Sequence, residues 1–125
     1  FEAVGFGGGK TPFGTPFEPE GEEIKTALST LYDRMKADKK IGVIHQPQAA
    51  TNLDIADGDH VGSKEVRKLI EEKEFNLVLT GHIHESRGID RIDGTKVINP
   101  GPVLEGYYGI AVIEDEIKLE MKQIE

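Results

Sequence analysis

Two short apolar runs flank a predicted helix, and a histidine follows each run. Residues 41–44 (IGVI) and 77–80 (LVLT) have the length and composition of buried strands. Between them, Ser63 is a suitable N-cap for a helix over residues 64–73, whose apolar side chains repeat at helical spacing. A strand, a helix and a strand in this order form a βαβ unit with parallel strands. The sequence therefore predicts an α/β fold.

Three histidines lie at the carboxyl ends of these two predicted strands. His45 follows the first run directly, while His82 and His84 follow the second in a Gly-His-x-His motif. In an extended segment, residues two positions apart point to the same side, as two converging metal ligands would. If the strands are neighbours, all three histidines share the sheet edge at which α/β folds bind ligands. We therefore predict a metal site there; the alternative is that one or more of them are ordinary core or surface histidines.

The composition limits the metal ligands and partners that are available. The chain has no cysteine, so any metal must be held by His, Asp, Glu or Asn. A net charge of -8 argues against broad binding to nucleic-acid phosphates, although divalent cations could reverse the field in one cleft, which leaves nucleic acid open as a substrate. No apolar run is long enough to span a bilayer, so we expect no membrane partner and a cytoplasmic location.

The remaining segments predict further strands and one more helix. An amphipathic helix is expected over residues 22–37, with its apolar face formed by Ile24, Leu28, Leu31 and Met35. Strands are expected over residues 2–7, 88–92, 96–98, 107–113 and 117–121, with a hairpin turn at Asp93-Gly94. Residues 49–62 form a polar loop, in which we expect His60 to be a loop or outer-shell residue.

Glycine and proline are concentrated in residues 1–17. Residues 9–11 (GKT) resemble the end of a phosphate-binding P-loop, but Val4 stands where that motif needs a glycine. Pro12 and Pro16 also interrupt the helix that should follow. We interpret this segment as a short strand that enters a loop.

The order of the motifs resembles the carboxyl-terminal half of the calcineurin-like metallophosphoesterases. The chain has His-x-Pro at residues 45–47, Gly-His-x-His at 81–84, and then a predicted hairpin with Asn-Pro-Gly at 99–101. The resemblance implies part of a four-layer αββα sandwich with a mixed β-sheet. It makes residues 1–125 the carboxyl-terminal portion of a single metallophosphoesterase-like domain. It also implies two divalent metal ions, with His45 and His82 on one ion and His84 on the other.

The earlier motifs of that family are not recognisable in this chain. Asp-x-His, Gly-Asp and Gly-Asn-His would supply a bridging carboxylate, an asparagine ligand and a histidine that assists catalysis. Because position 1 is Phe rather than Met, we expect the downstream part of a longer chain. An upstream half or a partner chain would then complete the site.

The expected function is metal-dependent hydrolysis of a small phosphate ester, either a monoester or a diester, at a two-metal site. Imidazole ligands favour transition metals, but manganese, iron, zinc, nickel and magnesium are not distinguished by the sequence. The alternative is a non-catalytic fragment or interaction domain that retains the fold. On either hypothesis, we expect the isolated chain to be inactive.

Overall fold

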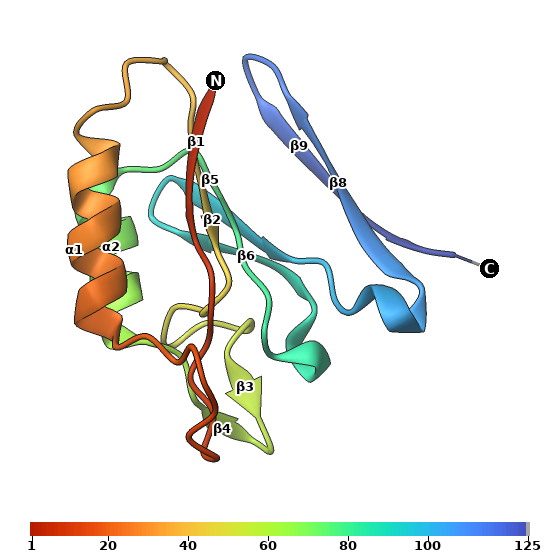
Figure 1. Cartoon of the computed structure of the whole chain (residues 1–125). Helices are drawn as coiled ribbons and strands as arrows, with labels where there is room; N and C mark the ends of the chain where they lie inside the picture. The colour runs from red at the N-terminus through yellow and green to blue at the C-terminus, as the bar shows by residue number, and fades with distance from the viewer. Residues whose placement is uncertain (125) are drawn as a thin grey trace.

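The computed structural model describes residues 1–124, which form a mixed sheet with helices on one face and a hairpin on the other (Figure 1). The strand order of this five-stranded sheet is β1-β2-β5-β7-β6. β1, β2, β5 and β7 are parallel, whereas β6 is antiparallel to β7. The bounds are β1 (Glu2–Phe6), β2 (Lys40–Ile44), β5 (Leu77–Leu79), β6 (Gly88–Ile92) and β7 (Thr95–Asn99). The predicted α/β class and the parallel βαβ unit are therefore confirmed.

Two helices cover one face of the sheet (Figure 1). They are α1 (Gly21–Tyr32) and α2 (Lys64–Lys73), and α2 has the predicted bounds. The Ser63 side chain accepts a hydrogen bond from the Val66 N–H at 3.1 Å, as an N-cap should. The main apolar core lies between the helices and the sheet and includes Ile24, Leu28, Ile44, Leu69, Ile70, Phe75, Val78 and Val97. Neither helix has the length and apolar character that crossing a membrane requires.

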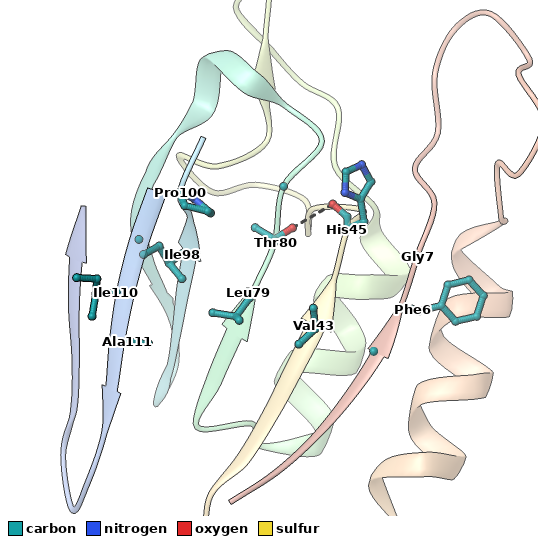
Figure 2. A pocket seen from close by; sticks show the side chains of 13 residues that line it. Phe6, Gly7, Val43, His45, Leu79, Thr80, Ile98, Pro100, Ile110 and Ala111 are labelled. Carbon is teal, nitrogen blue, oxygen red and sulfur yellow. Dashed lines mark hydrogen bonds between the residues drawn. The ribbon is translucent and has the colours of Figure 1, made fainter. Parts of the chain in front are cut away.

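A separate hairpin, β8 (Tyr107–Ile113) and β9 (Ile117–Gln123), lies against the opposite face (Figure 1). It packs on the sheet through a smaller apolar cluster that includes Ile41, Leu77, Ile98 and Ile117. A cavity of about 490 Å³ remains between β8 and the strands. Figure 2 shows it lined by side chains of both layers, with His45 at the strand ends. The second face of the sheet is therefore only partly covered by the described chain.

The polar loop over residues 49–62 contains a small hairpin that we did not predict. Its strands are β3 (Ile55–Ala56) and β4 (Asp59–His60), joined at Asp57-Gly58. Both turn residues have positive φ, 50° and 84°, as a tight hairpin with an Asp-Gly turn requires. The turn signal was present in the sequence, but strands of two residues are too short to give an alternating pattern.

The first helix is shorter than predicted, because it ends at Tyr32 instead of Ala37. After it, the N–H groups of Lys36 and Ala37 donate to the Glu2 carboxylate, each at 2.7 Å, and not to helical carbonyls. This contact pulls the chain toward the start of β1. Leu31, in the last turn of α1, is 38% exposed, although the predicted helix placed it on the inner face.

Substitutions in α1 test which of its side chains face the core. Leu28→Ala should lower the free energy of unfolding by about 2–5 kcal/mol, because Leu28 is fully buried and its truncation leaves a cavity. Leu31→Ala should lower it by about 0.5 kcal/mol or less, because this side chain already meets water. Urea unfolding followed by circular dichroism measures both values. Equal losses would show that the helix is rotated from the orientation described.

Candidate metal centre

His45 lies where β2 ends, and the strands on both sides hold its backbone. Its N–H donates to the Phe6 carbonyl at 3.2 Å, which ties it to β1. Its carbonyl accepts from the Gly81 N–H at 3.2 Å and from the Thr80 hydroxyl at 3.3 Å, on the side of β5 (Figure 2). The backbone of His45 is therefore fixed at the sheet edge where the parallel strands end.

His82 lies in a strained turn directly after β5. The Ile83 N–H donates to the Gly81 carbonyl at 2.8 Å, and the His82 φ is 70°. A bond across one residue with this φ is the mark of a γ-turn of the rare, strained kind. Such a conformation costs on the order of 1–3 kcal/mol outside glycine. The extended backbone that we assumed for residues 82–84 is therefore wrong.

The rings of His45 and His82 face each other at this edge. His45 Nε2 lies 3.2 Å from His82 Nδ1, and the ring planes are inclined by 70°. His82 Nε2 lies 2.7 Å from the Lys10 carbonyl oxygen. A carbonyl can only accept, so His82 Nε2 carries the proton and the neutral ring presents a lone pair on Nδ1. The strand topology thus brings together two of the three predicted ligands, 37 positions apart in sequence.

This spacing fits two imidazoles that share one metal ion. In a tetrahedral zinc site with Zn–N bonds of about 2.0–2.1 Å, two ligand nitrogens are about 3.3 Å apart. The observed 3.2 Å is close to that separation. The proton that His45 Nε2 donates to His82 Nδ1 would have to move to His45 Nδ1 for both nitrogens to bind a metal. The pair therefore suits one part of a transition-metal coordination shell.

The surroundings of His45 favour the neutral imidazole, which is the form that binds a metal. Burial lowers its pKa from the ordinary value, and the neighbouring charges of His82 and His84 lower it further. Metal ligation requires a neutral imidazole, so a depressed pKa favours binding at neutral pH.

His84 is less constrained than the other two histidines. It begins the 3-10 helix η1 (His84–Ser86), and its side chain is exposed. Among residues 1–124, no group of three or more His, Cys, Asp or Glu side chains is arranged to hold a metal ion. The assignment of His45, His82 and His84 as metal ligands therefore stays a prediction.

Asn99, at the end of β7, holds the histidine-bearing loop in place. Its buried side-chain amide donates to the carbonyls of Ile83 and Ser86, at 2.9 and 3.1 Å. Its Oδ1 accepts from the Gly101 N–H at 3.0 Å. We identified the Asn-Pro-Gly motif in the sequence but gave Asn99 no role. In the structure, the Asn99 side chain holds the turn that carries His82 through these hydrogen bonds.

His60 belongs to a separate loop, as expected. Its Nδ1 lies 2.7 Å from the buried Asp54 carboxylate, which also accepts three backbone N–H groups of the loop. Burial raises the pKa of Asp54, but these hydrogen bonds outweigh that effect and the pKa is lowered overall. The ionised carboxylate therefore organises the loop, and His60 is one of its donors.

Comparison with known proteins identifies a family and a relative of this chain. The model of a family described as "Metallophosphoesterase, calcineurin superfamily" matches residues 21–124. The chain is 47% identical over 105 residues to the uncharacterized protein MJ1162 of Methanocaldococcus jannaschii, a match that covers 79% of this chain and 47% of that protein.

Two solved structures share the fold. One crystal structure superimposes with a TM-score of 0.73 at 22% identity, over 97% of this chain and 48% of the other. The crystal structure of TT1561 from Thermus thermophilus gives a TM-score of 0.64 at 22% identity, over 97% and 52%. The chain thus spans about half the length of the proteins that it matches.

The pKa of His45 can be tested by NMR. The pH titration of its ring should have a midpoint below the ordinary value of about 6.5. Since the pKa is lower in the folded state than in the unfolded state, this group's contribution to stability is complete above about pH 6.5 and is lost as the pH falls through the folded-state value. His82→Gly, which tolerates the turn, should raise the midpoint, whereas His60→Gln should leave it unchanged. A midpoint at or above the ordinary value would contradict the described environment.

Removal of the Asn99 amide should release the loop. Asn99→Ala removes the donor to the buried Ser86 carbonyl and one of the two donors to the Ile83 carbonyl, which should lower the free energy of unfolding by about 1–3 kcal/mol. Hydrogen exchange should increase at residues 82–86, measured by mass spectrometry. Asn52→Ala, in an exposed position, is the control and should change neither quantity. Unchanged hydrogen exchange at residues 82–86 in the Asn99 variant would show that the Asn99 side chain does not hold this loop.

Proposed function

Because the chain belongs to the calcineurin superfamily of metallophosphoesterases, we propose that it contributes the histidine ligands of a metal-dependent phosphoesterase. The observation that carries the proposal is the pair of ring nitrogens, His45 Nε2 and His82 Nδ1, that face each other at 3.2 Å. In this proposal the pair holds one divalent ion and the exposed His84 contributes to a second. The substrate is a small phosphate ester, either a monoester or a diester.

The bound metals would supply positive charge to the phosphoryl oxygens and would acidify a water molecule for attack. The residues of this chain would hold the metal ions and orient the side chains that bind them. His82 presents a neutral lone pair on Nδ1, because the Lys10 carbonyl keeps its proton on Nε2. His45 would present its Nε2 lone pair once its proton has moved to Nδ1. Asn99 fixes the turn from which His82 extends, so the ligand geometry is set before any metal binds.

The proposed site also needs donors that the described residues lack. Two imidazoles neither bridge two divalent ions nor offset their charge. Since the chain spans about half the length of its relatives, we propose that the complementary half of the domain supplies the carboxylate and asparagine ligands.

The open apolar face of the sheet is the surface on which we place that half. Val43 of β2 and Ile110 of β8 are 45% and 40% exposed and line the same cavity, which extends to His45. Exposed apolar side chains that surround a cavity are costly in water and are typical of surfaces that another segment covers. Packing on this face would bring new ligands to the edge where the histidines lie.

Reconstitution tests the proposal. The isolated chain should hydrolyse bis-p-nitrophenyl phosphate at the background rate with manganese present, because its ligands do not hold two metals at a fixed separation. Addition of the complementary half, taken from the full-length coding sequence, should produce activity that His82→Ala or His84→Ala returns to background. Val43→Asp should prevent the reconstitution, whereas Leu31→Asp, on the helical face, should allow it.

Two outcomes would contradict separate parts of this proposal. Activity in the reconstituted protein that survives both histidine substitutions would disprove the ligand assignment. Robust turnover by the isolated chain, lost in the same histidine variants, would show that no complementary half is needed. The alternative, a non-catalytic interaction domain, predicts binding of the complementary half without turnover.

A further inference from the structure

The glycine-rich segment after β1 lies against His82 and is bonded to the residue that follows His45. The Lys10 carbonyl accepts from His82 Nε2 at 2.7 Å, across 72 positions of sequence. The Lys10 N–H donates to the Gln46 side chain at 2.7 Å. Gln46 is buried and directly follows His45. One residue of the segment is therefore bonded to His82 and to the neighbour of His45.

A side chain at residue 9 would collide with the ring of His82, whereas a side chain at residue 7 would not. A Cβ atom at Gly9 would lie 2.6 Å from His82 Nδ1, the nitrogen that faces His45. A Cβ atom at Gly7 would have no atom within 4 Å. The backbone at Gly9 therefore approaches the imidazole more closely than any other residue type permits.

The hydrogen bond from His82 to Lys10 decides which ring nitrogen is free. A neutral imidazole carries its proton on either nitrogen, and the partner of one nitrogen fixes the state of the other. Because the Lys10 carbonyl only accepts, it holds the proton on Nε2 and leaves Nδ1 as an acceptor. Without that carbonyl, part of the population would carry the proton on Nδ1, where it blocks a metal.

We propose that Gly9 and Lys10 orient His82 and select the tautomer and ring position that a divalent transition metal needs. The inference rests on the proposed function only in treating His82 as a metal ligand. It gives the glycines that resemble a phosphate-binding loop a different role. They let a backbone carbonyl reach an imidazole, and Lys10 acts through its main chain. Lys10 is thus a positioning residue and not a ligand.

Two alanine variants of the 125-residue chain form a matched test. Zn²⁺ is the probe, and isothermal titration calorimetry measures its Kd. Gly9→Ala should weaken binding by about 10–100-fold, as expected when an outer-shell partner of a ligating histidine is displaced. Gly7→Ala, two residues away, should bind Zn²⁺ as the unchanged chain does.

The tautomer of His82 gives a second readout that needs no metal. Long-range ¹H–¹⁵N correlation spectra should show the proton on Nε2 in the unchanged chain and in Gly7→Ala. Gly9→Ala should shift part of the population to Nδ1–H. Gln46→Ala removes the acceptor of the Lys10 N–H, so the Lys10 carbonyl is held less firmly, and no atom is added near the His82 ring. This variant should change the tautomer in the same direction. This second variant keeps the test valid if Gly9→Ala does not fold.

The outcomes separate this inference from the proposed function. If His82→Gly weakens Zn²⁺ binding but Gly9→Ala and Gln46→Ala do not, the orienting role is wrong and His82 remains a ligand. If His82→Gly leaves the Kd unchanged, the ligand role itself fails. If the unchanged chain binds no Zn²⁺ because the complementary ligands are missing, the tautomer readout alone decides the orienting role. A proton on Nδ1 in the unchanged chain would overturn the inference directly.

Discussion

The parallel pairing of β2 with β5 is the constraint on which the site depends. Its register sets Ile41 opposite Leu77 and Val43 opposite Leu79, so both strands end at the same level. A slip of two residues would preserve the buried faces but would move His45 by about 6.6 Å along the strand direction. The ring contact of 3.2 Å with His82 would then be lost. Register, set by the apolar cores on the two faces of the sheet, is therefore also what brings the two imidazoles together.

Local signals were sufficient to predict most of the fold. Ser63 and the apolar spacing that follows it gave the bounds of α2, and Asp93-Gly94 gave the hairpin between β6 and β7. The convergence of His45 with His82 followed from topology, because parallel neighbours end at one edge. These predictions succeeded where a short stretch of sequence determines the structure by itself.

Apart from the short β3–β4 hairpin, the main features that we missed depend on how segments are held by their surroundings. Glu2 accepts from the Lys36 N–H, 34 residues away and beyond the end of α1 at Tyr32, and no periodicity in the sequence signals this contact. Lys10 reaches His82 through a main-chain atom, so its side-chain type carries no information about the contact. The γ-turn at His82 goes against local backbone preference and persists because its surroundings hold it. A backbone conformation that goes against local preference is expected at functional sites.

The partly covered sheet face has a practical consequence for how such a chain is made. Val43 and Ile110 border a wide apolar cavity that the described residues leave open. During synthesis, surfaces of this kind attract chaperones or other copies of the same chain until something covers them. The yield of folded protein should therefore depend on when a covering segment becomes available. A covering segment present as the chain leaves the ribosome meets a single exposed face, whereas one added after purification must compete with self-association.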